Sequence, residues 1–195
     1  MNWKVLILIG LFGYGTYHHF HHRPIIHGPG EIAPNVPVQD TSAIPAFQLK
    51  DFTVKPLAEY RIEARILAKE NYSFGTEAEI APTDLAVGWG PMSDETVLNK
   101  IEISQGNRFF YWHADQFPIP QREIEIHAAN MHIIPANDTI KQRLDNVRAG
   151  QVVHIKGQLV EVKKANGWHW RSSLTREDTG SGACELMYVT EFTLK

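Results

Sequence analysis

The fold is decided by the stretch Gln151-Val-Val-His-Ile-Lys-Gly-Gln-Leu-Val-Glu-Val162. Its apolar residues alternate with polar ones, which is the pattern of a β-strand that buries one face. The alternating apolar residues change from odd-numbered positions before Gly157 (Val153 and Ile155) to even-numbered positions after Leu159 (Val160 and Val162). A glycine inside a strand, together with such a change of phase, predicts a β-bulge or the sharp bend that turns the corner of a β-barrel.

Further strands and two short helices are predicted on both sides of this stretch. The pair Asn166-Gly167 is typical of a hairpin turn into a second strand at 168–174. Helices are predicted at 93–101, after the N-cap Ser93, and at 137–149, after the N-cap Asn137. The other strands are predicted, from alternation and apolar runs, at 60–66, 101–104, 108–113, 123–128, 131–135 and 183–192.

The segment from Gly150 to Val162 and the hairpin after it resemble the glycine, charged strand, glycine, apolar strand pattern of OB-fold barrels. The resemblance covers the last third of the chain and implies a mainly β, OB-like barrel with two short helices. The blocks Gly88–Asp94 and Arg171–Glu185 are similar to those of an uncharacterised family of bacterial proteins with an N-terminal membrane anchor. That resemblance implies an architecture and assigns no activity.

The first 23 residues have the character of a membrane-targeting segment. Lys4 precedes an uncharged apolar run from Val5 to Tyr17, and we expect residues 5–20 to cross a membrane once as an N-terminal transmembrane helix. A cleaved signal peptide and an interfacial helix remain alternatives. The positive charge at Lys4 favours an inner-membrane protein whose globular part is periplasmic. We therefore expect an anchor at 1–23, a proline-rich linker at 24–45 and one β-rich domain at 46–195.

The composition fits one globular domain and argues against nucleic-acid binding. The chain has 195 residues, 43% of them hydrophobic, which is enough to bury a core. Its net charge is −3, so there is no general attraction to the phosphates of a nucleic acid. Cys184 is the one cysteine, which excludes a disulfide bond within the chain.

Aromatic residues are the first candidates for a binding surface. Trp168 and Trp170 alternate onto one strand face beside Arg171, where they could stack on a ligand or partner. The alternative is that the same face fills the core. Trp89 lies in a loop rich in glycine and proline and is a further candidate for contact with a partner. Aromatic residues of the strand 108–113 belong to the same group: Phe109, Tyr111 and Trp112.

Histidines and one aspartate are weak candidates for a metal site. A mixed set of imidazole and carboxylate ligands would suit zinc or a similar ion. The alternative is that these strand residues are exposed or hydrogen-bonded, and we expect no cofactor. The candidate ligands are His113, Asp115, His127 and His132.

Cys184 is a weak candidate for a nucleophile. His169 or His154 would act as its base, but a cysteine at the start of an apolar strand is more often a small buried side chain. Asp178-Thr-Gly-Ser181 resembles the Asp-Thr-Gly motif of aspartic proteases, although the polar residues before it favour a turn.

The sequence therefore predicts a membrane-tethered binding or assembly module of the bacterial envelope, with a protein partner and no assigned chemistry. The alternative is a metal-dependent or cysteine hydrolase that uses the histidines and aspartate or Cys184. A third possibility is a structural subunit whose apolar surface is covered by its neighbours.

Overall fold

A computed structural model describes residues 3–21, 23–175, 177–178, 180 and 182–195, apart from the side chains of 14 and 16–21. β-strands are the main regular structure in this part of the chain, and short helices lie in the connections between them. The elements in chain order are α1 (Trp3–His21), β1 (Val38–Thr41), β2 (Phe47–Leu49), β3 (Phe52–Asn71), α2 (Thr76–Ile80), β4 (Thr83–Gly88), the 3₁₀-helix η1 (Gly90–Ser93), α3 (Glu95–Leu98), β5 (Glu102–Gly106), β6 (Phe109–His113), α4 (Gln121–Ile126), β7 (Ala128–Pro135), α5 (Asp138–Asn146), β8 (Val152–Lys164), β9 (His169–Arg171) and β10 (Glu185–Leu194).

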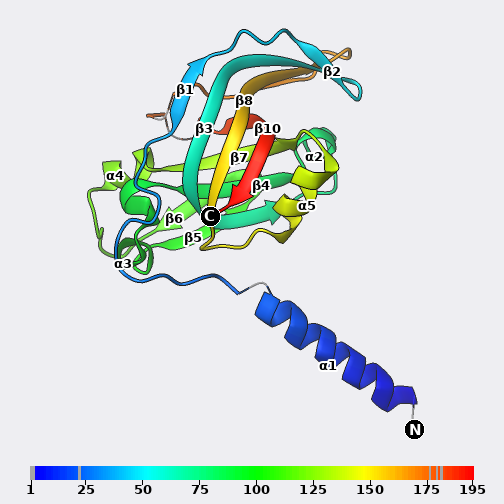
Figure 1. The fold of residues 1–195 in the computed structure, drawn as a ribbon, viewed down its shortest axis with the longest axis vertical. Helices are drawn as coiled ribbons and strands as arrows, with labels where there is room; N and C mark the ends of the chain where they lie inside the picture. Colours follow the sequence, from blue (N-terminus) through cyan, green and yellow to red (C-terminus); the bar gives the residue numbers. More distant parts are fainter. Residues whose placement is uncertain (1–2, 22, 176, 179, 181) are drawn as a thin grey trace.

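Five strands pair in a closed circuit around the main core. β3 pairs with β4, β4 with β7, β7 with β10, β10 with β8, and β8 again with β3 (Figure 1). Only the pairing of β7 with β10 is parallel within this circuit. α5 follows β7 and begins after Asn137, whose side chain accepts a hydrogen bond from the backbone N–H of Ile140 at 3.0 Å, as expected for an N-cap.

The long strands β3 and β8 bury opposite faces at their two ends. Leu159 of β8 belongs to the main core, whereas Val160 and Val162 belong to a second apolar cluster. β3 makes the same change at a bulge between Pro56 and Ala58, because one extra residue turns the following side chains to the other face. The phase change in the sequence of β8 therefore marks its passage from one core to another.

Gly157 lies where β8 and β10 approach most closely. A Cβ atom at this position would collide with the backbone carbonyl oxygen of Tyr188. The register of β10 shifts beside it, between Val189 and Glu191. The predicted irregularity is thus present at this place, but it lies in the partner strand rather than in β8.

The segment 24–45, predicted to be a linker, contacts the domain at several points. Residues 25–33, which we call the docked segment, run past the start of α3. The hydroxyl oxygen of Ser93 accepts hydrogen bonds from the backbone N–H groups of Ile32 and Ala33 at 3.2 and 3.1 Å. Ile25 N–H donates to the carbonyl oxygen of Ala149 at 2.9 Å. Further along, β1 pairs with β3.

The predicted fold class is wrong in two respects. Within the described residues four α-helices, α2 to α5, follow the N-terminal helix, where two short ones were predicted. An OB-like barrel also does not account for the β-structure. The pairing gives one eight-stranded sheet, in which β1, β2 and β9 add to the circuit, and a separate two-stranded sheet of β5 and β6. β1 and β2 come from segments in which no strand was predicted, whereas β9 lies within the predicted strand 168–174.

None of the helices in the described part of the chain is both long and apolar enough to cross a membrane. The predicted transmembrane helix and the single-pass, inner-membrane localisation with a periplasmic domain are therefore wrong. α1 extends away from the remaining elements (Figure 1), but the apolar run that it contains ends at Tyr17 and is followed by His18 and His19. A spanning helix needs roughly 20 apolar residues.

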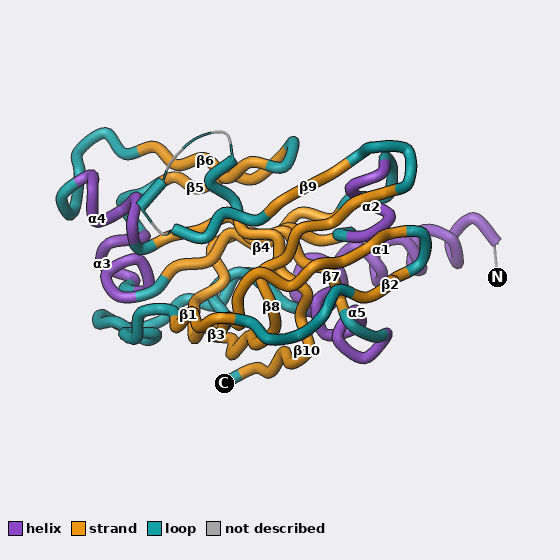
Figure 2. Tube along the Cα trace, turned by 90° about the horizontal axis from the view of Figure 1, so that it is seen from above, coloured by secondary structure: helices purple, strands orange, loops and turns teal. Residues whose placement is uncertain are grey.

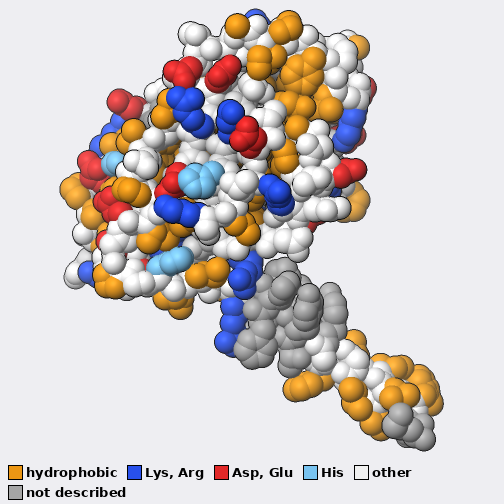
Figure 3. Space-filling model, viewed as in Figure 1, with side chains coloured by type: hydrophobic (Ala, Val, Ile, Leu, Met, Phe, Trp, Pro, Cys, Tyr) orange, Lys and Arg blue, Asp and Glu red, His pale blue; other side chains and the backbone are white. Residues whose placement is uncertain are grey.

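The visible face of the molecule carries charged side chains of both signs. Figure 3 shows lysine, arginine, aspartate and glutamate side chains intermixed over the domain, and hydrophobic side chains along the described part of α1. No large region of one charge marks a nucleic-acid site on this face.

Candidate functional site

The β5–β6 hairpin is fastened over the outer face of β4 and β7 (Figure 2). A bulge between Ile66 and Ala68 of β3 interrupts the pairing with β4 beside Ala86. The side chain of Gln105 fills this gap: its oxygen accepts a hydrogen bond from Ala86 N–H at 3.2 Å, and its nitrogen donates to the Asn130 side-chain oxygen at 2.7 Å. One side chain of β5 thus ties the hairpin to both strands below it.

Arg108 fastens the tip of the hairpin. Asn107 and Arg108 both have positive φ, 52° and 67°, so they form the tight turn between β5 and β6. Nη1 of Arg108 donates to Oδ1 of Asp84 at 2.7 Å and to the carbonyl oxygen of Ala81 at 2.9 Å. The guanidinium carbon lies 3.8 Å from the ring centroid of Tyr72, a cation–π contact.

His132 belongs to the same buried polar cluster. Its Nδ1 lies 2.9 Å from Oδ1 of Asp84, and its ring centroid is 4.6 Å from that of Trp170. Asp84 is fully buried, and its Oδ2 has no hydrogen-bond partner within the described part of the chain. The carboxylate is compensated by Arg108, and this positive charge would oppose a metal ion at His132.

A cavity of about 160 Å³ lies beneath the hairpin, and we call it the hairpin cavity. It is a partly open cavity bordered by β6, α4, the start of β7 and the loop between β9 and β10. Its walls combine aromatic and small apolar side chains with a few polar ones. The described residues that line it are Phe109, Phe110, Trp112, Ile124, Glu125, Ala128, Ala129, Asn130, Asp178, Gly180, Ala183 and Cys184.

Cys184 is in the wall of the hairpin cavity, but its environment is unlike that of a nucleophile. Burial raises the pKa of its thiol, although the side-chain N–H of Asn130, 3.4 Å from Sγ, acts in the opposite direction. A nucleophilic cysteine needs a lowered pKa, because the thiolate is the reactive form. His169 points to solvent from β9, and His154 lies 3.3 Å from a carboxylate oxygen of Glu63.

Asp178 also lines the hairpin cavity. Its Oδ2 accepts a hydrogen bond from the Ser173 hydroxyl at 2.6 Å. This contact is within the loop, as expected for turn chemistry. Thr179 and Ser181 of the predicted protease-like motif lie outside the described residues, so the motif as a whole stays a prediction.

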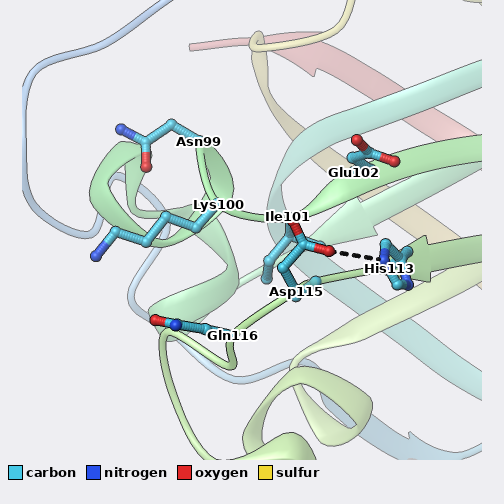
Figure 4. Close-up of a pocket in the computed structure, with 8 residues that line it drawn as sticks. Asn99, Lys100, Ile101, Glu102, His113, Asp115 and Gln116 are labelled. Carbon is cyan, nitrogen blue, oxygen red and sulfur yellow. Dashed lines mark hydrogen bonds and ion pairs between the residues drawn. The ribbon is translucent and has the colours of Figure 1, made fainter.

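The four candidate metal ligands lie in different surroundings. His113 and Asp115 are exposed beside an open hollow of about 520 Å³, with 3.4 Å between Nε2 and Oδ1 (Figure 4). His127 contacts Glu123 in α4, with 3.2 Å between Nδ1 and a carboxylate oxygen, and His132 is in the buried cluster. Over the described residues, no three His, Cys, Asp or Glu side chains are grouped so that they could hold a metal ion.

The tryptophans predicted to face a ligand lie against apolar clusters. Trp89 is in the main core with 2% of its surface exposed. Trp168 and Trp170 are half-buried, stand edge to face at a centroid distance of 6.3 Å, and pack on the second cluster. Arg171 is exposed, and its Nη1 is 3.7 Å from a carboxylate oxygen of Glu161. Of these four candidates, Arg171 alone is exposed.

Two aromatic residues named in the sequence do form an exposed pair. Phe109 and Tyr111 are 40% and 50% exposed, and their ring centroids are 6.2 Å apart on the outer face of β6. Phe110 and Trp112 alternate with them on the inner face and line the hairpin cavity, whose rim Phe109 also reaches. Sequence reasoning missed the buried cluster, for which the signal was Asp84 in an otherwise apolar strand.

Comparison of the chain with models of protein families, with curated proteins and with solved structures finds no match. The resemblance to an uncharacterised family of anchored bacterial proteins is neither supported nor contradicted by this result. A proposal about function therefore depends on the geometry of the chain itself.

Proposed function

We propose that this chain is a binding or assembly module that contacts a protein partner through the outer face of the β5–β6 hairpin. The observation that carries this proposal is the exposed pair Phe109 and Tyr111. Aromatic side chains are enriched at the centres of protein interfaces because they bury a large area at a small cost in side-chain entropy.

The hairpin is held in a fixed position before any partner arrives. Gln105, Asn130 and Arg108 fasten it to the sheet through hydrogen bonds of 2.7–3.2 Å. A surface that is already ordered loses less entropy on binding, which favours affinity. The same contacts would hold Phe109 and Tyr111 in one orientation toward the partner.

The charges around the hairpin favour a protein over a nucleic acid. Glu102 of β5 lies opposite His113 of β6, and Asp115 follows the hairpin. These groups provide no positive surface for phosphates, and the whole chain has a net charge of −3. The raised pKa of Cys184 and the separate positions of His113, His127 and His132 weigh against the alternative of a hydrolase.

The test places a photo-crosslinking amino acid in the full chain. Tyr111 is replaced by p-benzoylphenylalanine, and cells that produce the protein are irradiated. Leu194 is the control position, since it is also exposed but lies at the end of β10. We expect one reproducible protein adduct at 111, absent at 194 and lost when Phe109→Ser is added.

Phe109→Ser should leave the fold intact because the side chain is on the surface, with a change in Tm of about 2 °C or less. A loss of the adduct can therefore be assigned to the interface. The same adducts at 111 and 194, or an adduct that survives Phe109→Ser, would refute a partner surface on this hairpin.

A further inference from the structure

The hairpin cavity has an apolar interior of a definite size. Phe110 and Trp112 come from the inner face of β6, and Ile124, which is fully buried, comes from α4. Its volume of about 160 Å³ suits one small ring, since apolar cavities of about 150 Å³ are known to hold benzene.

The polar side chains at the floor of the hairpin cavity are already engaged. The Asn130 oxygen accepts from Gln105 at 2.7 Å, and its nitrogen lies 2.8 Å from the carbonyl oxygen of Arg108. Burial raises the pKa of the Cys184 thiol, which is therefore neutral near pH 7. The part of a ligand that enters this space needs no polar group of its own, because no polar side chain there requires a new partner.

The charged side chains that line the hairpin cavity are acidic. Glu125 and Asp178 are the charged residues among the described lining, which includes no lysine, arginine or histidine. Arg122 lies outside the lining, with 3.5 Å from its Nη1 to Glu125 and 3.6 Å from its Nη2 to Glu177, so it offsets only part of this charge. Aromatic ring faces attract cations as well, and carboxylates pair with them.

From this combination of aromatic walls and acidic lining, we propose that the hairpin cavity binds a small organic amine. The flat apolar body of the ligand packs between Phe110, Trp112 and Ile124, and its ammonium group lies toward Glu125 and Asp178. This site differs from the proposed partner surface at Tyr111, which does not line the cavity, although Phe109 borders both.

The test measures binding of benzylamine and of benzyl alcohol to the full chain by isothermal titration calorimetry. The two probes have the same ring and nearly the same size, but only the amine is charged. We expect a Kd of about 1 mM or lower for benzylamine, and binding of benzyl alcohol that is weaker by about fivefold or more. No heat of binding with benzylamine up to about 10 mM, or equal affinity for the two probes, would overturn the proposal.

Two pairs of variants locate the site. Ala128→Leu fills the cavity and should weaken benzylamine binding by about tenfold or more, whereas Ala46→Leu, at an exposed alanine, should not change it. Glu125→Gln removes a lining charge. Glu177→Gln removes a charge that contacts the same Arg122 from outside the lining.

We expect Glu125→Gln to lower the affinity by about threefold or more and Glu177→Gln to have less effect. Equal losses in these two variants, or unchanged binding in Ala128→Leu, would place the amine elsewhere and refute the proposal. The charge variants decide the question even if Ala128→Leu does not fold, since each replaces one carboxylate by an amide of nearly the same size.

Discussion

At the scale of single residues, Arg108 combines two costs that only its contacts can offset. Its backbone is in the left-handed region, which non-glycine residues rarely adopt, and its charge is largely removed from water. The side chain compensates the fully buried carboxylate of Asp84 and stacks on Tyr72. His132 Nδ1 also lies 2.9 Å from this carboxylate, so the charge of Arg108 offsets that of Asp84 in the polar cluster beneath the hairpin.

Arg108→Met should lower the free energy of unfolding by about 3 kcal/mol, because it leaves the Asp84 carboxylate buried without its cation. Arg171→Met is the matched control. The guanidinium of Arg171 is exposed and lies 3.7 Å from a carboxylate oxygen of Glu161, so we expect the free energy of unfolding to fall by about 1 kcal/mol or less. Urea denaturation of both variants measures the difference. Adding Asp84→Asn to Arg108→Met should recover part of the loss, and equal stability of the two arginine variants would contradict this account.

The sequence could reveal some of these residues and not others. The alternation of Phe109 and Tyr111 with Phe110 and Trp112 was visible, and it places one pair outside and the other inside. The pairing of Asp84 with Arg108 could not be predicted, since sequence periodicity shows which face of a strand a residue lies on but not which distant residue it contacts. Only the folding of the hairpin onto β4 brings them within 2.7 Å.

At the scale of elements, alternation and short apolar runs identified most of the strands of the main sheet. β6, β7, β8 and β10 all overlap the ranges predicted from the sequence, and Asn137 correctly marks the start of α5. The segment 123–128 was predicted as a strand but lies mostly in α4, which begins after Pro120. Two isoleucines two residues apart do not distinguish a strand from a single helical turn, and the prolines before them were the better signal.

Gly157→Ala should destabilise the protein by about 1–3 kcal/mol, because the added methyl group would meet the carbonyl oxygen of Tyr188 in the neighbouring strand. Gly106→Ala is the control: this glycine also lies in a strand, but a Cβ there meets no atom within 4 Å, so the expected change is about 0.5 kcal/mol or less. Thermal unfolding followed by circular dichroism compares them. If both variants were as stable as the parent, β8 and β10 could not approach as closely as described.

At the scale of the whole molecule, one pair of long strands contributes side chains to two separate apolar clusters. β3 and β8 stay paired from Phe52 and Lys164 to Arg65 and Val152, and each turns a different face inward along the way. Local periodicity shows that the buried face of the strand changes, but it cannot show which other residues cover the newly buried face. The second cluster is completed by parts that are distant in the sequence, among them Ile80, Ile134 and Trp168.

The docked segment also belongs to this scale, because its contacts join residues far apart in the chain. The buried hydroxyl of Ser93 accepts from Ile32 and Ala33, and Glu95 Oε2 accepts from the N–H of His27 at 2.9 Å. Arg65 holds Glu95 in place at 2.6 Å. The prolines of 24–45 predicted a semi-extended tether, whereas the docked segment bends at 29–30 and 32–33, and the hydrogen-bond partners that hold it lie beyond any local pattern.

Hydrogen exchange followed by NMR decides whether residues 25–33 behave as part of the domain. We expect the amides of Ile32 and Ala33 to exchange at least about tenfold more slowly than in an unstructured peptide, because both N–H groups donate hydrogen bonds to the hydroxyl oxygen of Ser93. Ser93→Ala removes this acceptor and should release both amides, while the amides of β1, which pair with β3 instead, keep their protection. Ser42→Ala, in the exposed loop after β1, is the matched control and should leave Ile32 and Ala33 unchanged. Exchange of both amides at the peptide rate in the parent protein would show that the segment is a free tether, as its proline content alone predicts.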